Sequence, residues 1–581
     1  MAGGTAGEAR AVHEGILRRQ SARESSARTY ARALPVVPVR ARGLTIEGAD
    51  GRRYLDCLSG AGTLALGHNH PVVLEAIRGV LDSGAPLSVL DLATPVKDAF
   101  ITELFRTLPP GLTDRARVQF CGPAGTDAVE AALTLVRAAT GRTGVLAFTG
   151  AYHGMTAGAL ALSGGAHDVR AARLPYPQDY RCPFGVGGPS GAELAARWTE
   201  SLLDDPKSGV PLPAGMILEP VQGEGGVIPA PDDWLRRMRQ LTADRSIPLI
   251  ADEIQTGVGR TGAFWAVDHS GITPDVMVLS KAIGGSLPLA VIVYRDDLDT
   301  WQPGAHAGTF RGNQLAMAAG TATLAYVREN ALAARAAALG SRMLTQLAAF
   351  AKGFACVGEV RGRGLMIGLE LVNPAADRAT PRGGALAGDC GDCGDCGDCG
   401  DCGVGGDCGD SRGFGGAGGL GGGDRGEAGG SGGSGDSRGL DDSRAAPRIP
   451  EPVRTPHPAA SGPVRTPYPA ASGPLRTPHP AASGPVRTPH PAASGPVRTP
   501  HPAAPELAAA VQRECLRRGL IVELGGRHAS VVRLLPPLTI SDEQAAAVLE
   551  RLTDAVTAAA RQHEHHGPHQ RRHPGQAQHT G

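Results

Sequence analysis

Short apolar runs alternate with helix-length amphipathic segments along residues 1–373. Four runs of four to six residues are rich in Val, Ile, Leu and Met and are too short for helices; they lie at 145–148, 216–220, 248–253 and 276–280. Strands that are buried on both faces of a parallel sheet read as continuous apolar runs of this kind. Their alternation with helical segments predicts an α/β fold, in which helices cover a mostly parallel sheet.

A second block with regular periodicity covers residues 506–562. The pattern predicts a helix, two strands and a second helix, at 506–519, 520–524, 530–537 and 541–560. A block of about 60 residues buries little apolar surface by itself, so we expect it to pack onto the first block.

Hydrophobic periodicity is absent from residues 374–505, between the two blocks. A Gly-Asp-Cys tripeptide repeats there and places cysteines from Cys390 to Cys402 in register, and an eleven-residue unit, VRTPHPAASGP, recurs from Val453 onward. Such a segment cannot bury enough apolar surface to offset the entropy of ordering, so we expect a disordered insert. We expect the same of the His-rich end, residues 563–581.

The Cys-x-x-Cys spacing within the insert is also a metal-ligand pattern, because clustered thiolates bind zinc or cadmium. Strict tandem repetition beside a second tandem repeat instead indicates repeat expansion in a tolerant loop, and we expect no metal site. Zinc or cadmium titration of the isolated segment would decide between the two interpretations.

Charge and hydropathy exclude several classes of protein. The chain carries 57 basic and 57 acidic residues, whereas binders of nucleic acid or anionic membranes depend on a basic excess. No apolar run approaches the ~18 residues that cross a bilayer, and the first residues, MAGGTAGEARAVHEG, contain no hydrophobic signal core. We therefore expect a cytoplasmic protein that binds neither nucleic acid nor a membrane.

Lys281 is one of four lysines in the chain and directly follows the apolar run 276–280. An amine at the end of a buried strand is what a Schiff-base lysine requires, although a strand-end lysine taken alone is usually a surface residue. Asp252 lies at the end of the run 248–253, where a carboxylate needs a cationic partner. Pyridoxal phosphate would supply a pyridinium nitrogen for the aspartate and an aldehyde for the lysine.

The segment VQFCGPAGTDAVEAAL predicts a strand, a tight turn and a helix. Gly125 and Thr126 fall at the start of this helix, where free backbone N–H groups and the positive end of the helix dipole suit a phosphate. The alternative is an ordinary capped helix, with Thr126 or Asp127 as the cap.

The combination of ADEIQTGVGRTG with SKAIGG at this separation is highly specific, and through it the chain resembles the class III aminotransferases. The resemblance covers nearly everything outside the insert and the C-terminal end. It implies the pyridoxal-phosphate transferase fold type I, with a large cofactor domain and a small α+β domain built from both chain ends. The implied segments are 1–60, 311–373 and 506–562 for the small domain, 61–310 for the large domain, 374–505 for the insert and 563–581 for the tail.

The resemblance also implies roles for individual residues. Lys281 would hold pyridoxal 5'-phosphate as a Schiff base and carry a proton between substrate and cofactor. Asp252 would keep the pyridine nitrogen protonated, and Gln255 would bond near the ring 3-oxygen. Tyr152 would stack on the cofactor ring, with His153 beside it.

Three further residues are assigned in the same way. Glu219 resembles the acidic gate near the substrate, and Gln222 would line the site with it. Thr309, in HAGTFRGN, matches a residue that completes the phosphate site of the partner subunit. The resemblance therefore implies an obligate homodimer with shared active sites.

A finer similarity, to the diaminobutyrate–2-oxoglutarate aminotransferases associated with siderophore and diaminopropane synthesis, lies in CLSGAGTLALGHNHP, FCGPAGTDAVEAAL, YRCPFG and IVELGGRHASVVRLLPPLTI. The ectoine-route branch is similar but lacks the Gly-Gly-Arg-His stretch found here at 525–528. Arg533 matches the arginine that pairs with a substrate carboxylate, which its planar guanidinium can bind through two hydrogen bonds. The alternative for Arg533 is a surface ion pair.

The reaction implied is a ping-pong transfer of the terminal amino group. L-2,4-diaminobutyrate would give L-aspartate 4-semialdehyde and pyridoxamine phosphate, and 2-oxoglutarate would then collect the amino group and leave as L-glutamate. Other ω-amino acids (ornithine, lysine, 4-aminobutyrate or ectoine-route diaminobutyrate) stay open as substrates. A non-catalytic scaffold or metal-binding protein is the alternative of another class, against which the intact set of site residues argues.

Overall fold

The computed structural model describes residues 6–165, 171–376 and 500–565. The Cys and Pro repeats lie outside these residues, as do residues 566–581 of the His-rich end, so the predictions of disorder and of no metal site there stay predictions.

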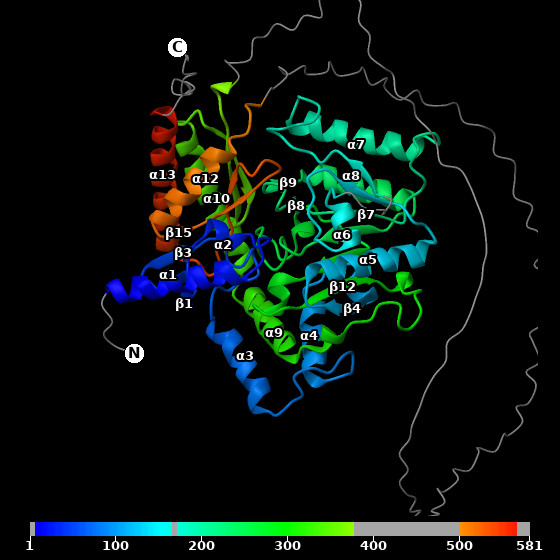
Figure 1. Cartoon of the computed structure of the whole chain (residues 1–581). Coiled ribbons are helices and arrows are strands. Elements are labelled where there is room, and N and C mark those ends of the chain that lie inside the picture. Colours follow the sequence, from blue (N-terminus) through cyan, green and yellow to red (C-terminus); the bar gives the residue numbers. More distant parts are fainter. Residues whose placement is uncertain (1–5, 166–170, 377–499, 566–581) are drawn as a thin grey trace, which may run out of the picture. The chain divides into compact units, whose positions relative to one another are not determined.

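A seven-stranded sheet forms the centre of the fold (Figure 1). Its order is β4 (Ala116–Gly122), β12 (Ala290–Arg295), β11 (Val276–Leu279), β10 (Leu249–Asp252), β7 (Gly215–Leu218), β5 (Val145–Phe148) and β6 (Ala171–Leu174). The strands from β11 to β6 are parallel, and β12 runs antiparallel to both of its neighbours. The mostly parallel sheet confirms the predicted fold class, and the four predicted apolar runs are β5, β7, β10 and β11.

The central strands are apolar throughout because helices cover both faces of the sheet. Ile250 belongs to the apolar cluster that contains the buried face of α5 (Gly125–Thr140). Leu249 and Ala251, on either side of it, belong to the cluster that contains Trp234 of α8 (Asp232–Asp244). Successive residues of a strand point to opposite faces, so an uninterrupted apolar run results. The other described α-helices between residues 57 and 331 are α3 (Pro71–Asp82), α4 (Pro95–Phe105), α6 (Ala157–Leu162), α7 (Gly188–Asp204) and α9 (Gln314–Glu329).

Two four-stranded sheets pair C-terminal strands with earlier parts of the chain, one with N-terminal strands and the other with strands at 357–371. One has the order β1 (Pro38–Arg42), β2 (Thr45–Gly48), β3 (Arg53–Asp56) and β15 (Leu520–Ile521), and the other β13 (Val357–Arg363), β14 (Met366–Leu371), β17 (Val531–Leu534) and β16 (Glu523–Gly525). A two-stranded ribbon pairs β8 (Val221–Gln222) with β9 (Ile228–Pro229). The C-terminal elements therefore lie beside the N-terminal ones, as the orange and dark blue segments show in Figure 1.

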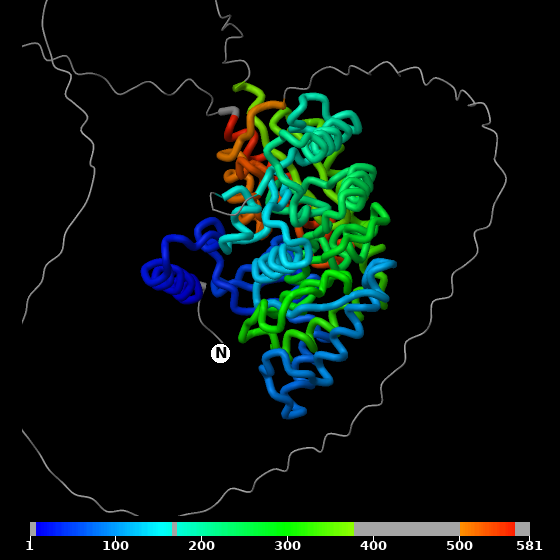
Figure 2. Tube along the Cα trace, turned by 90° about the vertical axis from the view of Figure 1, so that its right-hand side faces the viewer, coloured from blue at the N-terminus to red at the C-terminus, as the bar shows by residue number. Residues whose placement is uncertain are grey.

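The C-terminal block differs from its prediction at two places. The predicted single strand 520–524 is divided at Val522, because β15 pairs with β3 whereas β16 pairs with β17 in a different sheet. The final helix, α13 (Asp542–His565), continues into the segment that was predicted to be the tail. The remaining helices are α1 (Ala6–Arg23) and α2 (Tyr30–Ala33) at the N-terminus, α10 (Leu332–Ala351), and α12 (Pro505–Arg517); Figure 2 shows α1 at the edge of the described part.

The chain leaves and re-enters the fold at neighbouring points on either side of the repeats. Val372 and Ala503 form an antiparallel bridge, and the backbone N–H of Asn373 donates to the carbonyl of Pro502 at 2.8 Å. The returning His501 is held by the loop after β6, since its N–H donates to the Tyr180 hydroxyl at 3.3 Å. Within the described ranges, no helix combines the length and the apolar character needed to span a bilayer.

Candidate active site

A cavity of about 270 Å³ lies at the edge of the large sheet where the parallel strands end. Because parallel strands end at one edge, the residues that follow β5, β7, β10 and β11 converge there. The cavity brings together eight of the eleven residues in the predicted site: Gly125, Thr126, Tyr152, His153, Glu219, Asp252, Gln255 and Lys281. Glu224 also lines it and was not predicted.

Lys281 directly follows the strand β11 and Ser280, and it begins the short 3-10 helix η3 (Lys281–Gly284). Its φ of 52° lies in the left-handed region, which side-chain-bearing residues seldom adopt, so packing holds this backbone in a strained conformation. Burial lowers the pKa of its amine, an effect that the charge of Arg533 adds to and the charges of Glu224, Asp252 and Glu523 oppose. A buried amine with a lowered pKa is suited to nucleophilic attack and to proton transfer.

Asp252, at the end of β10, is buried and accepts two hydrogen bonds. Its Oδ2 lies 2.7 Å from Nδ1 of His153, and its Oδ1 accepts from the backbone N–H of Ile254 at 3.1 Å. Burial acts to lower the pKa of His153, but the hydrogen bond to Asp252 and the charges of Asp252 and Glu219 outweigh it, so the pKa is raised. Nε2 of His153 is buried and has no hydrogen-bond partner among the described residues.

The helix α5 begins at the opposite end of the cavity, after the strand β4. Its first two residues, Gly125 and Thr126, line the cavity, and their backbone N–H groups belong to the helix start, where no intrahelical acceptor exists. Asp127 caps the turn, since its Oδ2 accepts from the N–H of Ala124 at 3.0 Å. Asp127 therefore acts as the cap that the sequence offered as an alternative. This cap leaves the backbone N–H groups of Gly125 and Thr126 available to an anion.

Gln255 and Tyr152 border the cavity from two sides. Nε2 of Gln255 donates to the carbonyl of Ala61 at 3.1 Å, and its Oε1 is buried with no hydrogen-bond partner among the described residues. A Cβ on Gly223 would lie 1.9 Å from that oxygen, so a larger residue there would displace the Gln255 amide. Tyr152 is 43% exposed, which leaves its ring accessible at the cavity.

Glu219 lines the cavity with both of its oxygens occupied, and its predicted role as an acidic gate stays a prediction. Both of its oxygens accept from backbone N–H groups at 2.9 Å, Oε1 from Tyr152 and Oε2 from Gly223. Burial raises the pKa of Glu219 to about 7. Glu219 therefore organises the loops around the cavity. Gln222 was expected to line the site, but it is not among the residues that line the cavity. Its side chain is fully buried and donates to the carbonyl of Thr149 at 3.1 Å.

Glu224 is the carboxylate that faces Arg533. Nη2 of Arg533 donates to both oxygens of Glu224 at 2.8 Å and lies 2.6 Å from Oε2 of Glu523. The Arg533 side chain is completely buried, which contradicts the alternative of a surface ion pair. Its Nε and Nη1 have no hydrogen-bond partner among the described residues. The hydroxyl of Tyr30 donates to the other oxygen of Glu523 at 2.8 Å, so two carboxylates share one guanidinium behind the cavity.

The sequence did not single out Glu224, Glu523 or Tyr30. The available signals were the position of Glu224 between glycines in QGEGG and the position of Glu523 in the strand adjoining Arg533. In the structure, Glu523 and Arg533 are cross-strand neighbours of β16 and β17. Neither signal indicates which charges meet until the strands pair.

Thr309 lies outside the cavity of this single chain. It begins the short 3-10 helix η5 (Thr309–Gly312) on the surface, next to Phe310, which is 67% exposed. Its predicted role, completing the phosphate site of a second subunit, stays a prediction.

The residues of the cavity fit pyridoxal phosphate. The buried orphan atoms Nε2 of His153 and Oε1 of Gln255 need polar partners, which an oxygen-bearing and nitrogen-bearing ring can supply. Asp252 can face a protonated ring nitrogen, the start of α5 can take the phosphate, and Lys281 offers the amine.

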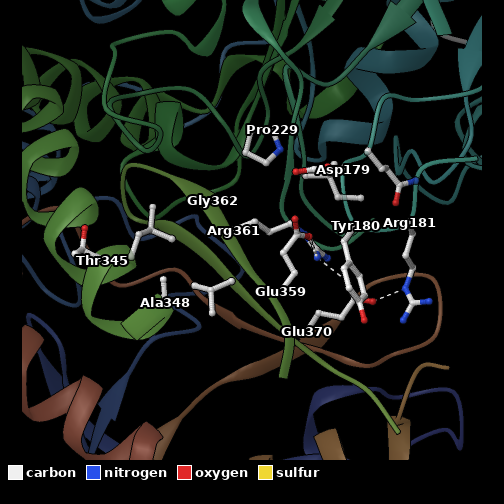
Figure 3. A pocket seen from close by; sticks show the side chains of 14 residues that line it. Asp179, Tyr180, Arg181, Pro229, Thr345, Ala348, Glu359, Arg361, Gly362 and Glu370 are labelled. Carbon is white, nitrogen blue, oxygen red and sulfur yellow. Dashed lines mark hydrogen bonds and ion pairs between the residues drawn. The ribbon is translucent and has the colours of Figure 1, made fainter. Parts of the chain in front are cut away.

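A second cavity, of about 460 Å³, lies away from this site, between the loop after β6, the helix α10 and the strand β13 (Figure 3). Its charged side chains neutralise one another, since Nη1 of Arg361 lies 2.5 Å from Glu359 and 2.6 Å from Glu370, and Arg181 also pairs with Glu370. Nε of Arg361 donates to the carbonyl of Gly226 at 2.9 Å, in the turn that carries Glu224. This cavity therefore supports the loop of the active site and holds no unpaired catalytic group.

Comparison with known proteins agrees with this site. The family model described as "Aminotransferase class-III" matches residues 26–392. A diaminobutyrate–2-oxoglutarate aminotransferase of Rhizobium meliloti is 44% identical over 559 residues, covering 95% of this chain and 93% of that protein. A protein of the same name from Haemophilus influenzae is 47% identical over 65% of this chain and 84% of its own.

Solved structures show the same fold. An amine transaminase from an uncultivated Pseudomonas species, with pyridoxal phosphate bound, matches with a TM-score of 0.64 at 24% identity, over 92% of this chain and 98% of that one. An (S)-enantioselective ω-transaminase from Thermomicrobium roseum matches with a TM-score of 0.66 at 21% identity, over 94% and 98%. At these identities the structures support the fold alone, whereas the family match covers most of the chain. The chain is a member of the class III aminotransferases, a pyridoxal-phosphate-dependent transaminase.

Proposed function

We propose that the enzyme transfers the terminal amino group of L-2,4-diaminobutyrate to 2-oxoglutarate, giving L-aspartate 4-semialdehyde and L-glutamate. The observation that carries the proposal is the arrangement of one cavity: a half-buried Lys281 and the Asp252–His153 pair line it, and Arg533 pairs with Glu224, which also lines it. The relatives that carry this reaction in their names, at 44% and 47% identity, support the choice of substrates.

The cofactor supplies an electron sink that stabilises negative charge at the reacting carbon. Asp252 would hold a positive charge at the ring nitrogen, and His153 orients Asp252 through the 2.7 Å hydrogen bond. The N–H groups of Gly125 and Thr126 would bind the phosphate at the start of α5. Tyr152 and Gln255 would hold the ring from two sides of the cavity.

Lys281 holds and moves the proton at the reacting carbon. Burial in the cavity lowers the pKa of its amine, so the neutral form that accepts a proton forms more readily than on a lysine in water. Its position at the rigid end of β11 keeps the amine in reach of both atoms that exchange the proton.

Arg533 and Glu224 let one site accept two substrates that differ in charge. 2-oxoglutarate carries a carboxylate next to its reacting carbon, and Arg533 binds it once Glu224 moves away. Diaminobutyrate carries no carboxylate at that position, and Glu224 then keeps Arg533 neutralised. Without Glu224 or a substrate carboxylate, the buried guanidinium would keep Glu523 as its one remaining carboxylate partner among the described residues, and this incomplete pairing is unfavourable.

We also propose that the enzyme works as a homodimer in the cytoplasm, with Thr309 of each subunit completing the phosphate site of the other. Exposed apolar side chains lie on the surface that carries Thr309, where Ser88 forms a bridge with Asn313: Leu87, Leu90, Leu92 and Phe310. Sedimentation analysis tests the dimer. Thr309→Ala should weaken cofactor binding without dissociating the dimer. A monomeric, fully active enzyme would contradict this proposal.

The test of the function uses the purified full chain saturated with pyridoxal phosphate. We expect glutamate to form from 2-oxoglutarate with diaminobutyrate, at a higher kcat/KM than with ornithine, lysine or 4-aminobutyrate. Lys281→Ala should abolish both the turnover and the visible absorbance of the lysine-bound cofactor, whereas Lys352→Ala, at an exposed lysine, should preserve both. A clear preference for another amine would contradict the proposed substrate.

A further inference from the structure

The turn between β16 and β17 contains Arg527, for which the mechanism above has no role. This turn packs against the active-site loop, because the N–H of Gly526 donates to the carbonyl of Glu224 at 2.8 Å. Gly526 has a φ of 82°, which glycine adopts without strain, and a second hydrogen bond, from Ala529 to its carbonyl, closes the turn. The position of Arg527 is therefore fixed relative to Glu224, which lines the cavity.

The guanidinium of Arg527 is anchored to the loop that follows β5. Its Nη2 donates to the carbonyl of Thr149 at 2.8 Å and to its hydroxyl at 3.2 Å. A Cβ on Gly150 would lie 2.7 Å from Nε, so glycine leaves room for the guanidinium there. Gly150 is two residues from Tyr152, which lines the cavity. Arg527 thus lies between two loops that both contribute to the active site.

Arg527 has no carboxylate partner in the described part of the chain, in contrast to Arg533, which is shared by two. Partial burial lowers the pKa of Arg527, whose side chain stays exposed to solvent, and no neighbouring acidic group opposes this effect. The two bonds to Thr149 occupy only Nη2, so Nε and Nη1 can still donate. A guanidinium held in place with free donors and no counter-charge is suited to binding a carboxylate.

The four reactants of the proposed reaction share such a carboxylate. Diaminobutyrate and aspartate 4-semialdehyde react at C4, and their C1 carboxylate carbon is three bonds away. Glutamate and 2-oxoglutarate react at C2, and their C5 carboxylate carbon is also three bonds away. One cation at a fixed distance from Lys281 can therefore bind all four molecules, whereas Arg533 serves only the carboxylate next to C2.

We propose that Arg527 binds this distal carboxylate in both half-reactions and thereby selects substrates of this length. The inference rests on the proposed function and deepens it. Arg527 is then a specificity-determining residue, and the Gly-Gly-Arg-His turn is the element that presents it.

The test compares each substrate with an analogue that lacks the distal carboxylate. For diaminobutyrate the analogue is 1,3-diaminopropane, and for 2-oxoglutarate it is 2-oxopentanoate. In Arg527→Gln we expect kcat/KM to fall about 10- to 100-fold for the two natural substrates, mainly through KM, and at most about threefold for the two analogues. Arg527→Lys should recover part of the loss, and Arg513→Gln, at an exposed arginine of α12, is the matched control.

Two results would overturn the inference: equal losses for substrates and analogues, which indicate a structural role, or no loss for either natural substrate. The visible absorbance of the bound cofactor and the melting temperature show whether the variant is folded. If the wild type prefers an amine other than diaminobutyrate, the proposed function fails separately. The comparison of 2-oxoglutarate with 2-oxopentanoate then still decides the role of Arg527.

Discussion

One guanidinium nitrogen of Arg533 lies 2.8 Å from both carboxylate oxygens of Glu224, although 309 residues separate the two in the sequence. Glu224 lines the cavity and Arg533 lies behind it, so a substrate carboxylate reaches Arg533 only by displacing Glu224. Glu523 stays beside Arg533 and keeps part of its charge compensated when this happens.

Glu224→Gln should strengthen binding of 2-oxoglutarate, because the carboxylate of Glu224 then no longer competes with the substrate for Arg533. We expect the KM for 2-oxoglutarate to fall about fivefold, which corresponds to roughly 1 kcal/mol for a lost charge-assisted hydrogen bond. Steady-state kinetics at saturating diaminobutyrate measure this change, with Glu75→Gln on the exposed side of α3 as the control. A higher KM for 2-oxoglutarate in Glu224→Gln would contradict the exchange.

Asp252→Asn should reduce kcat by about 100-fold or more, because the charge that faces the ring nitrogen is removed from a buried site. Since Lys281 is unchanged, the visible absorbance of the bound cofactor should persist. His153→Gln, which keeps Asp252 but alters its 2.7 Å hydrogen bond, should have a smaller effect. Single-turnover kinetics with each substrate measure both variants, and equal effects of the two substitutions would show that His153 does more than orient Asp252.

Glu219 makes stability depend on pH. Burial raises its pKa to about 7 from an ordinary 4.5, so the folded protein holds this proton more tightly than the unfolded chain does. Its contribution to stability is therefore complete below about pH 4.5 and is lost as the pH rises to about 7. Glu219→Gln cannot ionise and should lose less stability than the wild type over this interval.

Melting temperatures between about pH 5 and about pH 7.5, at constant saturating cofactor, measure that difference. Glu193→Gln, on the exposed face of α7, should follow the wild-type curve. Parallel curves for the wild type and Glu219→Gln would contradict the raised pKa.

Replacement of residues 380–500 by a short Gly/Ser linker should leave an active enzyme that binds its cofactor. The described residues on either side of this segment come close together, since Val372 bridges to Ala503. If the roughly 120 residues contribute only a longer closed loop, the replacement should raise the free energy of unfolding by roughly 2 kcal/mol. Denaturant unfolding and cofactor titration measure the two quantities, and loss of cofactor binding would show that the insert is more than a passive connection.

The sequence predicted the site best where a candidate residue lies directly at the end of a buried strand. The runs 216–220, 248–253 and 276–280 are strands of the large sheet, and Asp252 and Lys281 lie at the same edge because those strands are parallel. It was less informative for the C-terminal block, where 520–524 was expected to be one strand. Local periodicity does not show that β15 and β16 belong to different sheets, because that division depends on partners hundreds of residues away.

By itself, the sequence determined the α/β fold and the position of Asp252 and Lys281 at the ends of neighbouring strands. Buried parallel strands, and the residues that follow them, can be recognised from the local pattern. Only the tertiary structure decided that Glu224, and not Glu219, faces Arg533. Both carboxylates lie in the same short loop, and the backbone N–H groups of Tyr152 and Gly223 occupy Glu219. Which of the two carboxylates is available to pair with Arg533 is therefore set by hydrogen bonds that form only after the loops pack together.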